Sequence, residues 1–451
     1  MLIKTLQAEL SHDQVSDRES DLFRHSQDES SQQRVEPEVV CFPESTEDVV
    51  TIVNIARAYR VPVTPYGAGS GLEGQAIPVK KGISVSFERM NRMVDFRFDD
   101  LTMTVEAGVT RKQLNEYINR HGLMFPIDPG ADASIGGMVA TNASGTTAVR
   151  YGSMRDQLLD LEVVTSDGAV IHTGTRAKKS SSGYHLTGLF AGSEGTLGLI
   201  TKITLKLHGI PEHVIAARCT FPTLEACSEA AQTILWSGVP IMRMEIIDAN
   251  SLAQVNAYGD YDYPARHSLF FEFAGTKTAA EEGAYFAEQL MREGGCDSWQ
   301  ASAESVERKQ LWKARHEISY AFRHQKGMSV IGGDVCVPIS ELPKMITYAH
   351  ELLEQSGLHG GILGHIGDGN FHTLIVYDPR IIGEKEKAEQ IHDVLTKKAI
   401  EVGGTCTGEH GVGLGKMKFQ KAEHGQALQW MQAVKHVFDP EGLFNPGKIW
   451  P

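Results

Sequence analysis

Apolar positions along the first 210 residues predict a domain of mixed helices and short strands. The stretch 42–63 opens with Ser45 and Asp48 at capping-box spacing and continues with apolar residues at helical intervals. Short apolar runs such as 83–87 are typical of strands, and the pattern of 110–122 predicts a second helix. Three glycine-rich loops join these elements, so we predict that residues 1–210 form one domain.

The pattern changes at residue 211. Longer helical patterns such as 224–238 alternate with strand-like runs such as 267–275, and glycine clusters become sparser. This predicts a second, α+β domain over residues 211–425. The last residues, 426–451, return to the proline, glycine and asparagine that are typical of turns.

Composition narrows the class of protein. The chain has 451 residues, of which 41% are hydrophobic and 22% charged, as in globular proteins with more than one domain. A net charge of −14 without a basic stripe argues against nucleic acid as a partner. Six cysteines without a C-x-x-C pair argue for a reducing compartment and against a disulfide framework, an iron–sulfur cluster or a structural zinc site. We find no targeting segment and no apolar run long enough for a transmembrane helix, and therefore expect a cytoplasmic protein.

The first glycine-rich loop, PVTPYGAGSGLEGQAIP, contains a G-x-G-x-x-G pattern at Gly69, Gly71 and Gly74. The dinucleotide fingerprint requires a helix directly after the glycines. Here Pro78 blocks the first helical turns and a strand-like run follows, so the loop connects two strands. Such a loop either holds a phosphate through its backbone N–H groups or is a plain flexible turn, and the spacing leaves both open.

Two histidines flank a predicted hairpin turn within residues 362–377. The hairpin would bring His365 and His372 close together, where they either share a metal or merely pack against the strands. Further along, Glu409 and His410 stand between glycines. Glu409 would complete a His₂–carboxylate metal site with open positions, and His410 would face the reactant as a base, because neighbouring side chains on extended backbone point to opposite sides.

Arg315 lies among apolar residues in a predicted helix over 311–322. An arginine in this setting forms an ion pair, here with Glu307 or Glu317, or it serves as a planar fork for a substrate carboxylate. The helical pattern alone leaves both options open.

Several motifs in a fixed order resemble one flavoprotein family. In chain order they read PYGAGSGLEG, SIGGMVATNASG, RYGS, GSEGTLGLIT, DVCVP, GHIGDGNFH, GEHGVG and FDPEGLFNPGK. Over most of its length the chain resembles the FAD-linked D-2-hydroxyacid dehydrogenases of the vanillyl-alcohol oxidase / p-cresol methylhydroxylase superfamily, most of all their D-lactate dehydrogenase (cytochrome) and glycolate oxidase D-subunit branch. The resemblance implies an α+β fold with a two-part FAD-binding domain, a cap domain with an antiparallel sheet, and a C-terminal segment that returns to the FAD domain.

The resemblance also implies that all three glycine-rich loops bind FAD. Covalent members of the superfamily attach the flavin to a histidine of the first loop, and Ser70 stands at that position here, so we expect non-covalent FAD. The residues that the resemblance assigns to FAD are Tyr66, Gly67, Ala68, Gly69, Ser70, Gly71, Pro129, Gly130, Ser134, Gly137, Asn142, Ser144, Tyr151, Gly195, Ile200 and Asn445.

The resemblance assigns metal binding, proton abstraction and substrate binding to the residues described above. The resemblance assigns a divalent metal (zinc, manganese or iron) to His365, His372 and Glu409. It makes His410 the base that takes the hydroxyl proton and Arg315 the group that holds the substrate carboxylate. The α-hydrogen would pass to flavin N5 as hydride, and the electrons would leave to an external acceptor such as a quinone, a cytochrome or an electron-transfer flavoprotein.

Two departures from hydroxyglutarate-type relatives bear on the substrate. These relatives carry a lysine before the aspartate of DVCVP and an asparagine two residues after the second histidine, where this chain has Gly332–Gly333 and Leu374. The loss of two polar groups favours a small D-2-hydroxyacid, most of all D-lactate. The alternatives are a glycolate oxidase subunit that works with iron–sulfur partner chains, a metallohydrolase, and a flavin-binding module without activity. A homodimer and peripheral docking at a membrane through the acceptor are left open.

Overall fold

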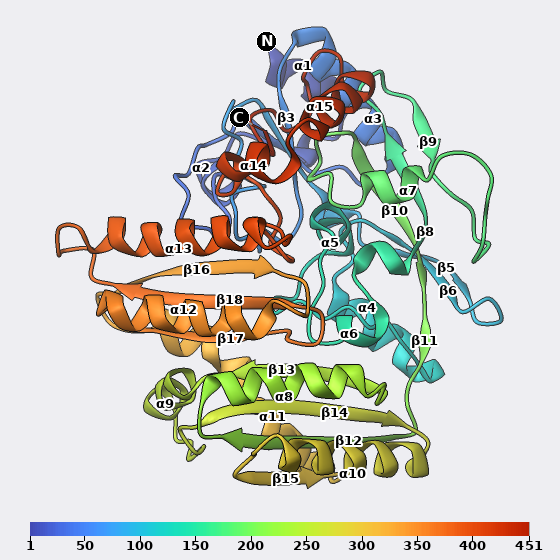
Figure 1. Ribbon diagram of the computed structural model, residues 1–451. Coiled ribbons are helices and arrows are strands. Elements are labelled where there is room, and N and C mark those ends of the chain that lie inside the picture. The colour runs from blue at the N-terminus through green and yellow to red at the C-terminus, as the bar shows by residue number, and fades with distance from the viewer. Residues whose placement is uncertain (451) are drawn as a thin grey trace. The chain divides into compact units, whose positions relative to one another are not determined.

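The computed structural model describes residues 1–450, which divide into two compact units (Figure 1). Unit 1 comprises residues 1–144, 152–210 and 409–451, and unit 2 comprises residues 145–151 and 211–408. The chain therefore returns to unit 1 at Glu409, whereas the sequence predicted a return at residue 426. The reason lies in hydrogen bonds that tie residues 410–415 to unit 1, described below.

The first sheet of unit 1 has the strand order β1-β2-β4-β3. Its strands β2 and β3 run parallel to β4, and β1 pairs with β2 antiparallel. Helix α3 (Thr46–Tyr59) begins with the predicted capping box, in which the Asp48 N–H donates to Ser45 Oγ at 3.1 Å and the Ser45 N–H donates to Asp48 Oδ2 at 3.2 Å. The four strands are β1 (Val15–Ser16), β2 (Val39–Cys41), β3 (Val63–Tyr66) and β4 (Ile83–Ser86).

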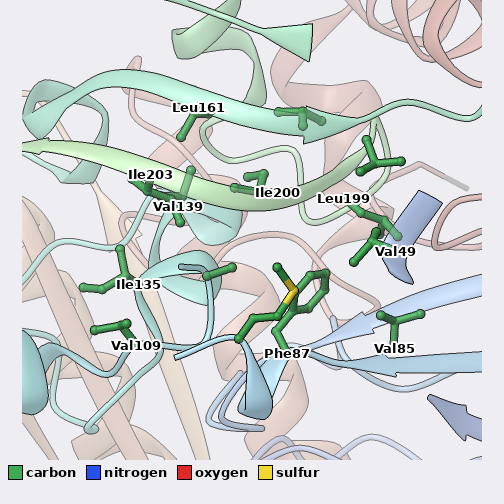
Figure 2. Packing of buried hydrophobic residues seen from close by; sticks show 14 of the residues in the cluster. Val49, Val85, Phe87, Val109, Ile135, Val139, Leu161, Leu199, Ile200 and Ile203 are labelled. Carbon is green, nitrogen blue, oxygen red and sulfur yellow. The ribbon is translucent and has the colours of Figure 1, made fainter. Parts of the chain in front are cut away.

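A second, antiparallel sheet of unit 1 has the order β5-β6-β10-β8-β9. One hydrophobic core joins both sheets, and Figure 2 shows Ile135 and Val139 packed near Ile200 and Ile203. The strands are β5 (Met93–Arg97), β6 (Thr102–Glu106), β8 (Leu158–Val164), β9 (Val170–His172) and β10 (Leu199–Lys206), with a short pair of β7 (Leu123–Met124) and β11 (His208–Gly209). The other helices of unit 1 are α1 (Leu2–Glu9), α2 (Glu19–Arg24), α4 (Arg111–Ile118), α5 (Ile135–Thr141), α7 (Leu186–Phe190), α14 (Gln420–His424) and α15 (Ala427–Phe438).

Helix α5 corrects one prediction, because the pattern of residues 132–174 indicated a second glycine- and serine-rich loop and two strands, with no helix. Ser134 caps this helix and two glycines fill its first turn, which gives a low helix propensity. A Cβ at Gly136 would lie 2.7 Å from the Ala107 Cβ, so glycine is required for close packing against the end of β6. Tertiary packing therefore outweighs local propensity here.

Unit 2 is built on a seven-stranded antiparallel sheet with the order β15-β12-β14-β13-β17-β18-β16. Helices α8, α10, α12 and α13 pack on one face, and α9 and α11 pack on the other (Figure 1). The strands are β12 (His213–Phe221), β13 (Ile241–Ile247), β14 (His267–Gly275), β15 (Ser298–Ser302), β16 (Ser329–Cys336), β17 (Gly360–Gly364) and β18 (Asn370–Tyr377). The helices are α6 (Ala148–Tyr151), α8 (Leu224–Trp236), α9 (Ala249–Tyr258), α10 (Lys277–Glu293), α11 (Ser305–Arg323), α12 (Leu342–Ser356) and α13 (Glu384–Glu401).

Strand alternation assigns side chains to the two faces of this sheet. In β18, Phe371 and Ile375 pack with the α8/α10/α12/α13 face, whereas Leu374 and Val376 pack with the α9/α11 face. His372 therefore shares the α9/α11 face, and the same alternation puts Glu245 of β13 and Asp334 of β16 there. The predicted α+β class is confirmed. Among residues 1–450, no helix has the length and apolar character needed to cross a bilayer.

Candidate functional site

The two predicted metal-ligand histidines lie together in unit 2. The antiparallel register of β17 and β18 pairs Leu363 with His372, and His365 follows the end of β17 directly. Their ring centroids are 5.4 Å apart in an edge-on arrangement, and the residues are 5% and 8% exposed. The hairpin thus holds two buried imidazoles side by side on rigid elements.

Glu245 joins His365 to Arg315, and it was not predicted from the sequence. Its Oε1 accepts from His365 Nδ1 at 2.5 Å and its Oε2 accepts from Arg315 Nε at 2.5 Å. The antiparallel register pairs Ile246 with Gly364, so the next position brings Glu245 opposite His365. The only signal in the sequence is a single carboxylate within the apolar strand IMRMEII.

His365 and Arg315 strongly favour the ionised form of Glu245, as its pKa shows. The residue is 0% exposed, and burial alone would raise its pKa. The charges and hydrogen bonds of His365 and Arg315 outweigh burial and lower the pKa to about 2. His365 Nδ1 faces this carboxylate, so a neutral His365 would keep its proton on Nδ1 and its lone pair on Nε2.

Arg315 lies on α11, as the helical pattern predicted, and it forms an ion pair with a partner that the spacing did not suggest. The sequence spacing suggested Glu307 or Glu317 as a partner, whereas Arg315 pairs with Glu245, 70 positions away in the chain. The pair is well buried, with the Arg315 side chain 19% exposed.

Asp334 forms a second buried carboxylate centre in unit 2. It accepts from Asn370 Nδ2 at 2.7 Å, from Thr407 Oγ1 at 2.8 Å and from the Gly408 N–H at 2.9 Å. Its Oδ1 also lies 3.6 Å from His372 Nδ1. Asp334 therefore fixes the start of β18 and the end of the segment that leads to Glu409.

In unit 1, the backbone around His410 is held by the first and third glycine-rich loops. Gln75 Nε2 donates to the His410 carbonyl at 2.6 Å. Glu194 accepts from the Val412 N–H at 2.6 Å and from the Gly413 N–H at 2.9 Å. These bonds explain why unit 1 includes residues 409–425.

The side chains of Glu409 and His410 have partners within unit 1 as well. Ser144 Oγ donates to Glu409 Oε2 at 2.8 Å. The Glu73 Oε1 lies 3.6 Å from the buried Lys416 Nζ and 4.0 Å from His410 Nδ1. Glu73, Gln75 and Glu194 were missed at the sequence level, although each stands in a quoted glycine-rich loop.

The predicted FAD loops meet around β3. A Cβ at Gly67 would lie 2.4 Å from Ser134 Oγ, and a Cβ at Gly195 would lie 2.3 Å from Pro65 Cγ. Gly69 has φ +71°, a conformation that side chains rarely adopt. The glycines thus let three loops approach one strand closely.

Asn445 ties two of these loops together. Its Nδ2 donates to the Gln75 carbonyl at 3.0 Å and to the Glu194 carbonyl at 2.8 Å. Its Oδ1 accepts from Lys448 Nζ at 3.1 Å. The side chain expected to reach the flavin ring therefore organises the loops themselves.

Other predicted FAD residues occupy different settings. Asn142 caps α5 and its Oδ1 accepts from Ser153 Oγ and from the Arg155 N–H, at 3.1 and 2.9 Å. Ile200 lies in the core of unit 1, and Tyr151 lies on α6, which belongs to unit 2. The remaining predicted residues, which are Tyr66, Ala68, Ser70, Gly71, Pro129, Gly130 and Gly137, are all in unit 1.

Two family models match the chain. The model described as "FAD binding domain" matches residues 37–174, and the one described as "FAD linked oxidases, C-terminal domain" matches residues 210–449. The fold is also similar to p-cresol methylhydroxylase with substrate bound, at 18% identity and a TM-score of 0.80, over 99% of this chain and 96% of that one. Together these matches define an FAD-linked oxidase fold.

Curated relatives refine this class. The chain is 44% identical to a probable D-lactate dehydrogenase, mitochondrial, of Danio rerio, over 94% of this chain and 87% of that protein. It is 32% identical to the glycolate oxidase subunit GlcD of Bacillus subtilis, over 94% of this chain and 92% of that protein. The chain therefore belongs to the FAD-linked D-2-hydroxyacid dehydrogenase family and is an FAD-dependent oxidoreductase, which confirms the resemblance drawn from its motifs.

Proposed function

We propose that this protein oxidises a D-2-hydroxyacid, most of all D-lactate to pyruvate, with FAD and a divalent metal, and passes the electrons to an external acceptor. The observation that carries the proposal is the arrangement of His365, Glu245 and Arg315. One buried carboxylate joins a histidine suited to a metal and an arginine suited to a substrate carboxylate. This combination supports a metal-assisted oxidation of a hydroxyacid.

The residues of unit 1 fit a non-covalent FAD. A Cβ at Gly67 would collide with Ser134 and a Cβ at Gly195 would collide with Pro65, so glycine lets the backbone of these loops pack closely where we propose that FAD binds. Ser70, rather than histidine, stands where a covalent link would form. We therefore assign the pyrophosphate to residues 66–74 and the remainder of FAD to the second and third loops.

Two histidines of unit 2 suit a divalent metal. With its Nδ1 bound to Glu245, His365 would offer Nε2 as a ligand, and His372 lies beside it. Glu409 directly follows Gly408, whose N–H is bound by Asp334, and we propose Glu409 as the third ligand. Two imidazoles and a carboxylate suit zinc, manganese or iron. When bound, the metal supplies polarisation of the substrate 2-hydroxyl, and FAD supplies the hydride acceptor at N5.

Residues of the chain itself would bind the substrate and accept its hydroxyl proton. Arg315 binds the substrate carboxylate through its guanidinium, which orients the 2-hydroxyl and the α-hydrogen. His410 accepts the hydroxyl proton as general base. Its backbone carbonyl is fixed by Gln75, so the imidazole starts from a defined position.

The preference for D-lactate rests on two cross-strand neighbours. Gly332 of β16 pairs with Leu374 of β18, beside the Asp334–His372 pair. Neither Gly332 nor Leu374 offers a polar group to a second substrate carboxylate, so a small or apolar side chain fits better. The Danio rerio relative is named a D-lactate dehydrogenase, in agreement with this preference.

A glycolate oxidase subunit is the second candidate, because a relative of that name aligns over nearly the whole chain. The six cysteines are scattered along the sequence without a C-x-x-C pair, so iron–sulfur clusters for such a function would come from partner chains. Within residues 1–450 their thiols are free, which also supports a reducing compartment, for which we propose the cytoplasm. A homodimer and docking at a membrane through a quinone, cytochrome or electron-transfer flavoprotein stay predictions.

An anaerobic visible spectrum of the purified protein tests the proposal. We expect D-lactate to bleach the flavin band, L-lactate to leave it unchanged, and a chelator to abolish bleaching. Stronger bleaching by glycolate would favour the oxidase-subunit alternative. A protein that binds no flavin, or whose flavin no hydroxyacid bleaches, would contradict the proposal.

A further inference from the structure

Glu245 is buried at the centre of unit 2, with one carboxylate oxygen on His365 and the other on Arg315. We propose that Glu245 is a positioning residue that holds the metal-ligand form of His365 and the orientation of Arg315 at the same time. Retention of the metal and binding of the substrate carboxylate would then depend on one side chain. The inference rests on the proposed function and deepens it.

Three elements that are distant in the chain meet at this carboxylate. Glu245 comes from β13, His365 follows β17, and Arg315 comes from α11. The pairing of β13 with β17 sets Glu245 opposite His365, and the alternation of β13 turns it toward the α9/α11 face. Each contact is therefore fixed by backbone pairing or helix packing rather than by a flexible loop.

For His365, the acceptor at Nδ1 decides which nitrogen is able to bind a metal. A neutral imidazole carries one proton, and a carboxylate on Nδ1 keeps that proton there and the lone pair on Nε2. Carboxylates behind metal-bound histidines act in this way generally, and their loss typically weakens metal binding about 10- to 100-fold. Glu245 stands in that position.

For Arg315, the contact at Nε fixes the plane of the guanidinium. The two Nη groups lie in the same plane, so their direction is set once Nε is bound. A carboxylate is recognised best by such a rigid fork. Without Glu245, the long arginine side chain would lose the bond that orients it.

The isosteric variant Glu245→Gln separates this role from mere packing. A glutamine has one acceptor and one donor group, so it cannot accept from both His365 and Arg315. We expect metal affinity, measured by competition with a coloured chelator, to fall about 10- to 100-fold, and the KM for D-lactate to rise more than kcat falls. Flavin content should be unchanged, because all residues that we assign to FAD except Tyr151 lie in unit 1.

Glu272→Gln is the matched control. Glu272 lies on the neighbouring strand β14, is also buried, and pairs with an arginine, since its Oε2 is 3.3 Å from Arg243 Nη1. This control removes a buried glutamate charge without touching His365 or Arg315. We expect its metal affinity and KM to match the wild type.

Glu245→Asp keeps the proposal testable if the glutamine variant fails to fold. It preserves the charge, shortens the side chain, and should restore metal affinity or KM in part. Normal metal affinity and KM in a folded Glu245 variant would overturn the inference while leaving the proposed function intact. A wild-type protein that binds zinc or manganese no better than the chelator, or is not reduced by D-lactate, would instead overturn the proposed function.

Discussion

Glu245 in unit 2 and Glu194 in unit 1 are both buried beside a segment with a predicted chemical role, and the two carboxyls are held differently. In unit 2, Glu245 is bound by two side chains that carry or accept positive charge, His365 and Arg315. In unit 1, Glu194 is 4% exposed and is bound by two backbone N–H groups, those of Val412 and Gly413.

The two pKa values move in opposite directions although both groups are buried. The pKa of Glu245 is lowered to about 2, because the charges of His365 and Arg315 outweigh burial. The pKa of Glu194 is raised to about 7, because burial outweighs the backbone hydrogen bonds and the charge of Lys448. What stands opposite a buried carboxyl thus decides whether it is a permanent charge or a group that titrates near neutral pH.

The largest expected effect comes from His410→Ala in unit 1. If this unit supplies the base as well as FAD, kcat for D-lactate should fall by about 10²- to 10⁴-fold, the usual contribution of general base catalysis. Flavin content and metal affinity should be retained, because the proposed loops and the two histidine ligands are intact. The rate of anaerobic flavin bleaching measures the effect.

His436→Ala is the control for this experiment, because it removes an exposed histidine of α15. It should bleach at the wild-type rate. A loss of less than about tenfold in His410→Ala would exclude His410 as the base.

The next effect concerns Glu194→Gln and stability as a function of pH. Between pH 4.5 and 7 the folded wild type binds more protons at Glu194 than the unfolded chain, so its stability falls as pH rises through this window. Above pH 7 the buried Glu194 is ionised, and this destabilises the folded wild type by about 3 kcal/mol, at 1.36 kcal/mol per pKa unit. A glutamine at this position does not titrate, so its contribution to stability does not change with pH. It keeps only one acceptor oxygen and therefore loses one of the two hydrogen bonds from the backbone N–H groups.

Urea unfolding from pH 5 to 8 checks this prediction. At pH 5 the wild type should have the larger free energy of unfolding. By pH 8 its free energy of unfolding should have fallen relative to that of Glu194→Gln by up to about 3 kcal/mol. The exposed Glu116→Gln should show no such trend. A stability difference between wild type and Glu194→Gln that does not vary with pH would contradict the assignment.

Local patterns were enough to predict many elements of both units. The capping box of Ser45 and Asp48, the helix that carries Arg315, and the hairpin of His365 and His372 all depend on residues close together in the chain. Such features are encoded by periodicity, caps and turn residues. The family motifs added the roles that we propose for residues on these elements.

The buried glutamates that contact the candidate site residues could not be predicted from local sequence patterns. Glu245 meets His365 because β13 pairs with β17, and strand order is not written in local spacing. Likewise Glu194 lies 218 positions from Val412, whose N–H it accepts. Helix α5 was missed because its glycines are favourable only once packed against β6.

The smallest effect expected is a change of substrate preference in Gly332→Lys. A Cβ at Gly332 meets no atom within 4 Å, and Gly332 shares the sheet face of Asp334 and His372. A lysine would add a cation to this face without a clash. We expect the ratio of kcat/KM for D-2-hydroxyglutarate to that for D-lactate to rise by up to about fivefold, since an exposed ion pair contributes about 0.2–1 kcal/mol.

The neighbouring Gly333→Lys is the contrast that makes this test decisive. A Cβ at Gly333 would lie 2.3 Å from Thr373 Oγ1, on the opposite face of the sheet. This variant should lower thermal stability without changing the substrate ratio. If both variants shift the ratio alike, the effect comes from disturbance of β16, and the small substrate is not explained by the missing cation at position 332. If only Gly332→Lys shifts it, the chemistry of that one sheet face accounts for the preference.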